Sequence, residues 1–345
     1  MHCPTCQAIL AERQKFCEEC GTALAFAAAS AAGSAGASNT TSFAGTFGSS
    51  TAGSAAPSAA ASASGLRPSA TASTPGINLA PGAAQQQAPL LQAIDAQLAL
   101  VSDVGRQYPV NQDAGCVGRS PDGAVIMVVA DGVSSADRAE VASNSASQAA
   151  FRFLQAHGGT NDAITLMRQA IGAAHEAVLA VPYSNKAREE PETTIVCARV
   201  AGRRATIGWV GDSRAYLLGP AGARILTRDD SWLLDTLDEN RMSLAAALAD
   251  RRSHAITQCL GMRDAEVDIH VCEAELQPGE QLLLCTDGLW NYFNDCASMA
   301  AAVQQASSTP EHATDAFAVC RQLVAMANAA GGRDNITVAL YRGMA

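Results

Sequence analysis

One stretch decides how this chain folds: Val125-Ile126-Met127-Val128-Val129-Ala130-Asp131-Gly132. The run is apolar, rich in β-branched residues and closed by a glycine, which predicts a strand buried on both faces. A bare carboxylate at the end of such a strand is costly unless a cation or hydrogen bonds compensate its charge. Asp131 is therefore expected to be a ligand.

The same pattern returns at two later places in the chain. It is repeated closely in Gln281-Leu282-Leu283-Leu284-Cys285-Thr286-Asp287-Gly288, and more weakly in Ile207-Gly208-Trp209-Val210-Gly211-Asp212. Each apolar strand delivers an aspartate next to a glycine. If the strand ends converge, the carboxylates form a cluster of hard oxygen ligands of the kind that holds magnesium or manganese.

Composition and charge exclude several classes of protein. The 345 residues carry a formal net charge of -10, which argues against a general nucleic-acid binder and against binding to an anionic membrane surface. No apolar run approaches the roughly 20 residues that span a bilayer, and the first residues do not resemble a signal peptide. We therefore expect a soluble, cytoplasmic protein with no nucleic-acid or membrane partner. The 11 cysteines suit a reducing compartment, because they fall in C-x-x-C pairs or mostly in apolar and helix-like stretches.

Two C-x-x-C knuckles stand near the N-terminus, Cys3-Pro4-Thr5-Cys6 and Cys17-Glu18-Glu19-Cys20. Each presents two thiolates to one ion, so Cys3, Cys6, Cys17 and Cys20 together predict one structural zinc. The alternatives are a redox pair, whose usual thioredoxin-like context is absent, and unliganded thiols. Because a four-cysteine site has no open coordination position, residues 1–24 are expected to form a zinc ribbon for protein docking or dimerisation.

The rest of the chain divides into a linker and one large domain. Residues 25–89 are mostly Ala, Ser, Gly and Thr with scattered Pro, and they lack the apolar bulk that offsets the entropy of ordering, so a flexible linker is predicted. Residues 90–345 show strands, two helices, several strands, helices and strands, which is no βαβ alternation. This order predicts an α+β fold of antiparallel sheets with helices covering their outer faces.

A series of short motifs runs along the large domain. The motifs are Asn111-Gln112-Asp113, Asp131-Gly132-Val133, Thr193-Thr194, Gly211-Asp212-Ser213-Arg214-Ala215-Tyr216, Leu226-Thr227-Arg228-Asp229-Asp230-Ser231, Ile256-Thr257-Gln258-Cys259-Leu260-Gly261, Cys285-Thr286-Asp287-Gly288-Leu289-Trp290 and Gly332-Arg333-Asp334-Asn335-Ile336-Thr337. In this order the motifs resemble those of the type 2C protein phosphatases, the metal-dependent serine/threonine phosphatase family. A single Asp-Gly pair is more typical of a turn, but an ordered series is not. The resemblance implies a four-layer α-β-β-α sandwich of two antiparallel sheets flanked by helices.

The resemblance also implies a binuclear metal site with catalytic aspartates. Asp131 would bridge two Mg or Mn ions, Gly132 would offer its carbonyl oxygen to one of them, and Asp287 and Asp334 would hold the other. Asp113 would hydrogen-bond the metal-bound waters. Hydrolysis of a phosphomonoester at neutral pH needs an activated water and charge neutralisation on the phosphoryl oxygens, and two divalent ions supply both.

Further residues are interpreted as secondary members of the site or as its support. Asp212, together with Asp287, would form a weaker third-metal site. Thr193-Thr194 and Arg214 are interpreted as scaffold, while Asn335 and Thr337 are interpreted as local hydrogen bonders. All 6 histidines fall outside the site motifs and are expected to be surface or packing residues.

The chain departs from the family pattern at three places. Tyr108 stands where the family commonly carries a phosphate-binding arginine, and Arg106 is close enough to substitute, so both are candidate phosphate-binding residues. Gln112 replaces a glutamate and removes a negative charge near the second metal. Ser134-Ser135 replace Gly-Gly or Gly-His, so no histidine adjoins the metal site as a general acid, and a metal-bound water would take that role.

The predicted function is metal-dependent hydrolysis of phosphoserine and phosphothreonine in proteins, opposing a cognate serine/threonine kinase in a bacterial signalling circuit. Two alternatives stay open. A pseudophosphatase or scaffold would bind a phosphoprotein without turnover, which Tyr108 and Gln112 motivate and the retained aspartates oppose. A hydrolase of small phosphoesters is chemically allowed, because the predicted contacts of the site are mainly with the phosphate group and the metal ions. The choice between magnesium and manganese is left open by an all-oxygen site.

Overall fold

The computed structural model describes residues 87–158, 162–183, 190–220, 222–310 and 314–343. The predicted zinc ribbon at residues 1–24 and nearly all of the predicted linker at residues 25–89 lie outside these ranges and stay predictions. The described residues belong to one compact unit. Within it, none of the helices is long and apolar enough to cross a membrane.

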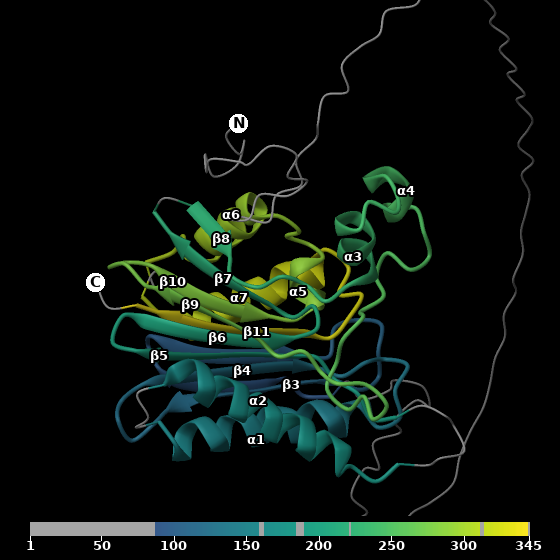
Figure 1. Cartoon of the computed structure of the whole chain (residues 1–345). Coiled ribbons are helices and arrows are strands. Elements are labelled where there is room, and N and C mark those ends of the chain that lie inside the picture. Colours follow the sequence, from purple (N-terminus) through teal and green to yellow (C-terminus); the bar gives the residue numbers. More distant parts are fainter. Residues whose placement is uncertain (1–86, 159–161, 184–189, 221, 311–313, 344–345) are drawn as a thin grey trace, which may run out of the picture. The chain divides into compact units, whose positions relative to one another are not determined.

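Two antiparallel sheets form the centre of this unit (Figure 1). The six-stranded sheet has the order β1-β2-β11-β10-β7-β8, and the five-stranded sheet has the order β3-β4-β5-β6-β9. The strands are β1 (Leu90–Asp95), β2 (Leu98–Asp103), β3 (Asp113–Arg119), β4 (Val125–Asp131), β5 (Ile195–Ala201), β6 (Arg204–Val210), β7 (Arg214–Gly219), β8 (Gly222–Ile225), β9 (His270–Glu275), β10 (Gln281–Cys285) and β11 (Ile336–Arg342). The α+β class and the two antiparallel sheets expected from the sequence are confirmed.

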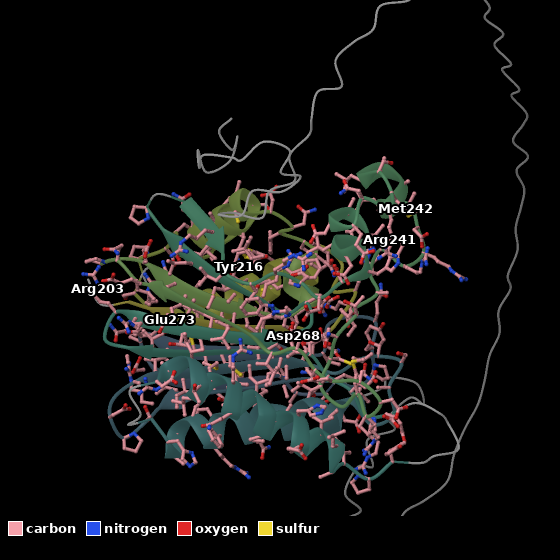
Figure 2. The ribbon with its side chains drawn as sticks, in the orientation of Figure 1. Arg203, Tyr216, Arg241, Met242, Asp268 and Glu273 are labelled. Atoms are coloured by element: carbon pink, nitrogen blue, oxygen red, sulfur yellow. The ribbon has the colours of Figure 1, made fainter. Side chains whose placement is uncertain are left out.

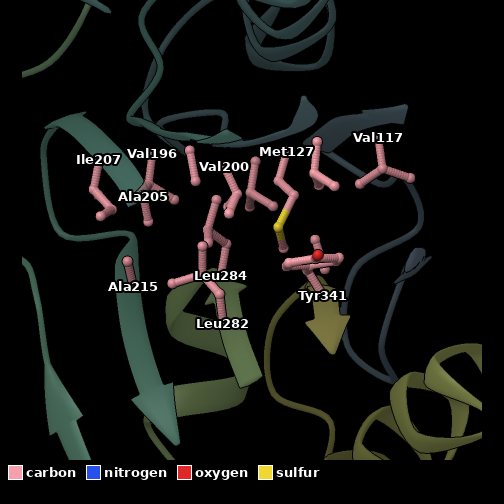
Figure 3. Packing of buried hydrophobic residues seen from close by; sticks show 14 of the residues in the cluster. Val117, Met127, Val196, Val200, Ala205, Ile207, Ala215, Leu282, Leu284 and Tyr341 are labelled. Carbon is pink, nitrogen blue, oxygen red and sulfur yellow. The ribbon is translucent and has the colours of Figure 1, made fainter. Parts of the chain in front are cut away.

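The decisive stretch forms β4, and its side chains are buried on both faces as predicted. Val125, Met127 and Val129 belong to the apolar core that also contains side chains of β10 and β11. Figure 3 shows Met127 directed toward Tyr341 of β11. Ile126 and Val128 point to the opposite face and pack against helices. The apolar run is continuous because β4 lies in the interior of its sheet and has a packed layer on either side.

Helices complete the outer layers of the sandwich. On the five-stranded sheet lie α1 (Ala139–Ala156) and α2 (Ala163–Leu179), which bury apolar side chains against β4 and β5. On the six-stranded sheet lie α6 (Cys296–Ala306) and α7 (Ala316–Ala329), which pack against β2, β10 and β11. The resulting order of layers is helix, sheet, sheet, helix. A short helix, α5 (Asp287–Trp290), follows β10 directly.

The connection between β8 and β9 forms a separate segment at one end of the sheets. It contains α3 (Trp232–Asp238) and α4 (Leu244–Leu248), whose first turns are capped by the hydroxyls of Ser231 and Ser243. Figure 2 shows Arg241 and Met242, which join these helices, at the end opposite to Arg203 in the β5–β6 turn. We call residues 231–260 the flap segment.

Candidate active site

Aspartates from several strands reach the same end of the two sheets. Asp131 ends β4, and Asp113, which begins β3, is paired directly opposite to it. Asp287 follows β10 and Asp334 precedes β11, and the antiparallel pairing of these strands brings the two carboxylates close enough to repel each other. Asp212 follows β6, and its carboxylate in turn feels that of Asp287. The convergence expected from the three aspartate-glycine strand ends therefore occurs.

Most of these carboxylates open into one pocket of about 560 Å³. Asp131, Asp212, Asp287 and Asp334 line it as half-buried side chains, and Glu192 adds a further carboxylate. Residues 254–259 of the flap segment form another part of the wall. The pocket is therefore strongly acidic on the side of the sheets and closed on another side by the flap.

Asp113 lies behind this pocket and is only 5% exposed. Its Oδ2 accepts hydrogen bonds from Thr286 Oγ1 at 2.9 Å and from Thr337 Oγ1 at 2.8 Å, whereas its Oδ1 is buried without a protein partner. Burial, together with the charges of neighbouring aspartates, raises the pKa of Asp113 to about 7. The orphaned Oδ1 is an acceptor that water in the site can satisfy.

The other aspartates of the cluster also hold their protons more tightly than free aspartate. Burial first, and then the neighbouring carboxylates, raise the pKa of Asp131 and of Asp212 well above the usual value. Burial and the charge of Asp334 raise the pKa of Asp287 to about 6. The pKa of Asp334 is raised by burial as well. Such a concentration of negative charge is costly in the folded protein unless cations compensate it.

Main-chain geometry holds the cluster in place. The carbonyl oxygen of Asp131 accepts hydrogen bonds from Thr193 Oγ1 and from the Thr194 amide, each at 2.8 Å. Gly132 follows, and a Cβ there would lie 2.5 Å from the Ala139 carbonyl oxygen, so no side chain fits. Gly288 is tighter still, because a Cβ would lie 1.9 Å from the Asn335 carbonyl oxygen. Thr193 and Thr194 therefore support the site, as the sequence predicted.

Asn335 and Thr337 have a larger role than the sequence suggested. Their interpretation as local hydrogen bonders was wrong, because their side chains bond to residues more than 200 positions away. Asn335 Oδ1 accepts from the Gln112 amide at 2.7 Å, and Thr337 holds Asp113. Both residues lie at the start of β11, and they tie this strand to the start of β3. No local pattern signals a contact of this range.

An aromatic residue supports Asp212. Trp290 Nε1 donates to the carbonyl oxygen of Asp212 at 3.0 Å, and the Arg214 guanidinium lies 3.7 Å from the centre of the Trp290 ring. Arg214 in turn makes a bidentate pair with Asp229. Because Trp290 belongs to α5, this network connects the segment that carries Asp287 with the loop that carries Asp212. The expected scaffold role of Arg214 agrees with these contacts.

The three departures from the family pattern lie at different places. Arg106 and Tyr108 are exposed and do not line the pocket, although the Arg106 amide bonds to the Gly332 carbonyl oxygen at 2.7 Å. The carbonyl oxygen of Gln112 accepts from the Gly132 amide at 3.1 Å, a contact that any side chain at this position would permit. Ser134 and Ser135 do line the pocket.

The donor set fits hard divalent cations. The half-buried aspartates offer only oxygen, and the Asp113 Oδ1 lacks a protein partner. Burial, and after it the neighbouring carboxylates, raises the pKa of Asp113 and of Asp131, as expected for acids crowded together without a cation. Within the described ranges, no three His, Cys, Asp or Glu side chains form a cage that could hold an ion alone. Ions bound here would complete their coordination with water and with carbonyl oxygens such as that of Gly132.

The sequence and the fold were compared with those of known proteins. The family model described as protein phosphatase 2C matches residues 106–326. A serine/threonine phosphatase, stp, of Listeria welshimeri is 31% identical over 242 residues, which cover 69% of this chain and 92% of that protein. The serine/threonine protein phosphatase PstP of Mycobacterium tuberculosis is 28% identical over 237 residues, which cover 67% of this chain and 44% of that protein.

Solved structures agree with this family match. The crystal structure of the M. tuberculosis serine/threonine phosphatase PstP/Ppp has a TM-score of 0.59 at 26% identity, covering 72% of this chain and 99% of that one. The catalytic domain of PstP in complex with two manganese ions has a TM-score of 0.57 at 26% identity, covering 72% of this chain and 98% of that one.

Proposed function

Because this chain belongs to the protein phosphatase 2C family, we propose that its aspartate pocket is the active site of a metal-dependent protein serine/threonine phosphatase. The observation that carries this proposal is the convergence of half-buried aspartates, all with raised pKa, on one pocket. The chain acts on phosphoproteins and uses Mn or Mg ions. The substrate is a phosphoserine or phosphothreonine side chain.

Different residues of the pocket would bind the ions and orient the attacking water. Asp131 and the carbonyl oxygen of Gly132 would hold one ion, Asp131 with Asp287 and Asp334 the second, and Asp212 with Asp287 a weaker third. Bound ions supply positive charge to the phosphoryl oxygens and make a water more acidic. Asp113 Oδ1, which has no protein partner, accepts a hydrogen bond from the attacking water and orients it. Thr286 and Thr337 hold Asp113 in the required position.

The phosphate group needs protein contacts as well. We propose that Arg106 reaches it from the side of Asp334, since the Arg106 main chain is bonded to Gly332, two residues before Asp334. Tyr108, 37% exposed, stays a candidate for a weaker contact. The scaffold alternative stays open for test, because neither residue lines the pocket, where it would neutralise the phosphoryl group during turnover.

Phosphate release from a phosphothreonine peptide tests the function. The purified chain is assayed with manganese, with magnesium and with a chelator, beside Asp131→Ala. Release that requires metal and vanishes in the variant supports the phosphatase. No release from the folded wild type with either metal would instead support a phosphoprotein-binding scaffold. A parallel assay on small phosphate esters distinguishes a small-phosphoester hydrolase.

We also propose that Cys3, Cys6, Cys17 and Cys20, which lie outside the described residues, bind one zinc ion in a ribbon that docks a protein partner. The paired C-x-x-C spacing supports this proposal. The cognate kinase and the cytoplasmic location stay predictions. A chain lacking residues 1–86 should lose one zinc by elemental analysis and keep its turnover on a free phosphopeptide. Loss of that turnover would mean that the N-terminal residues belong to the catalytic unit.

A further inference from the structure

The pocket wall contains one basic side chain. Of the residues that line it in the described part of the chain, several are carboxylates, none is lysine or arginine, and His254 is the single basic residue. A phosphorylated substrate that enters this pocket therefore meets one protein side chain that can donate a proton from nitrogen.

The described histidines differ in what they contact. His157 bonds to the Phe153 carbonyl oxygen and stacks on the Phe153 ring. His175 accepts from the Gly261 amide, and His270 bonds to Asp230. In the described part of the chain, His254 is the one histidine that combines an exposed side chain without a hydrogen bond and a place on the pocket wall. The sequence suggested a surface or packing role for every histidine. Packing contacts account for the other three, whereas His254 is a surface residue on the wall of the aspartate pocket.

The main chain fixes the position of His254 from one side. The carbonyl oxygen of Ala255 accepts from the Trp232 amide at 2.9 Å, and the Thr257 amide donates to the Asp230 carbonyl oxygen at 2.9 Å. Asp230 is bonded to Gly211 twice, through its amide at 3.0 Å and through its Oδ2 at 2.8 Å. Gly211 immediately precedes Asp212. The residues next to His254 are thus connected to the Asp212 loop through short, specific bonds.

The other end of the same stretch is attached to Asp131. Leu260 and Thr193 exchange two main-chain hydrogen bonds, at 2.8 and 3.1 Å. Thr193 Oγ1 donates to the Asp131 carbonyl oxygen at 2.8 Å. Residues 254–260 therefore span the pocket from the Asp212 side to the Asp131 side. This double attachment holds the main chain of residues 255–260 along the wall, and His254 directly precedes it.

From this geometry we infer that His254 is a catalytic residue that protonates the leaving group, and the inference rests on the phosphatase function proposed above. Water forms a new P–O bond while the bond between phosphorus and the serine or threonine oxygen breaks. The His254 imidazolium gives its N–H proton to the departing oxygen, which leaves as the alcohol. His254 then takes up from solvent the proton that the attacking water has lost, so protons balance over the cycle.

The need for this proton depends on the leaving group. A serine or threonine alkoxide is strongly basic and departs poorly without a proton, whereas p-nitrophenolate is weakly basic and departs without one. A general acid therefore accelerates the first reaction much more than the second. The pattern of loss over the two substrates separates proton donation from simple phosphate binding, which would affect both equally.

The test compares kcat for His254→Gln with wild type on a phosphothreonine peptide and on p-nitrophenyl phosphate, at saturating manganese, in the full chain. We expect kcat to fall about 100-fold on the peptide and only a few-fold on the aryl ester. His157→Gln, at the exposed end of α1, is the matched control and should behave as wild type. Equal losses on the two substrates, or no loss on the peptide, would overturn the assignment.

Failure of the function itself has a different signature. If wild type releases phosphate from neither substrate, the proposed phosphatase and the role of His254 are overturned together. If wild type is active and the variant loses nothing, only the role of His254 is overturned.

Discussion

Replacing Asp113 with asparagine should stabilise the metal-free protein above neutral pH. In wild type, burial raises the pKa of this carboxyl from 3.8 to about 7. Each pKa unit corresponds to about 1.4 kcal/mol, so holding the ionised group in the folded state costs about 4 kcal/mol. Asparagine stays neutral, and its Oδ1 can accept the two threonine hydroxyl bonds that Asp113 Oδ2 now accepts.

The sign of the pH effect follows from proton linkage. A carboxyl whose pKa is higher in the folded state contributes stability that is fully present below its unfolded value of 3.8 and is lost as the pH rises through about 7. The free energy of unfolding of metal-free wild type should therefore fall across this window. Asp113→Asn lacks the contribution of this carboxyl to the pH dependence. The free energy of unfolding of the variant should therefore exceed that of wild type by a margin that grows by about 4 kcal/mol between about pH 4 and about pH 8.

Urea unfolding in the presence of a chelator, followed by tryptophan fluorescence, measures this margin. The control is the same pair of proteins saturated with manganese, where the bound cations compensate the carboxylate and the margin should shrink. If the difference in free energy of unfolding between variant and wild type is the same at about pH 4 and about pH 8, the reasoning is refuted, since Asp113 would then not be held neutral by its surroundings.

Other perturbations address the neighbouring parts of the site. Asp131→Ala and Asp287→Ala should each abolish metal-dependent phosphate release while thermal unfolding stays cooperative; release at the wild-type rate in either would contradict the assigned ligands. Gly288→Ala should lower stability by about 1 to 3 kcal/mol and raise the manganese concentration needed for activity, because its Cβ would press on the Asn335 carbonyl oxygen at 1.9 Å. Unchanged unfolding and manganese titrations would rule this contact out. Trp290→Phe removes one donor to the Asp212 carbonyl oxygen and should cost about 1 kcal/mol in urea unfolding; a stability equal to wild type would show that the bond contributes nothing.

Much of the fold could be predicted from the pattern of apolar and polar residues along the chain. The apolar run of β4 predicted a strand buried on both faces, and the order of strands and helices predicted antiparallel sheets with helical cover. Side-chain periodicity and β-branched content carry this information, because burial of an element depends mainly on its own residues. The aspartates that end Val125–Asp131 and open Asp287–Trp290 were identified in the same way, as carboxylates too costly to bury without compensation.

Other members of the site were not accessible in this way. His254 gave no signal, since it belongs to no motif and lies in a loop. Thr337 was interpreted as a local hydrogen bonder, yet it holds Asp113 across the sandwich. The position of Arg106 relative to the pocket was also undetermined. In each case the position of the residue depends on bonds between segments far apart in the chain.

The sequence by itself determined which elements form and which of their faces are buried, and it predicted which carboxylates need a cation. Only the tertiary structure decided what surrounds these aspartates: the threonine hydroxyls that bond the Asp113 carboxylate, the indole that bonds the main-chain carbonyl oxygen of Asp212, and the His254 imidazole on the wall of the same pocket. The physical reason is the range of the interactions. Burial and strand pattern are properties of neighbouring residues, whereas these partners are brought together by the pairing of distant strands and by the return of the flap segment to the strand ends.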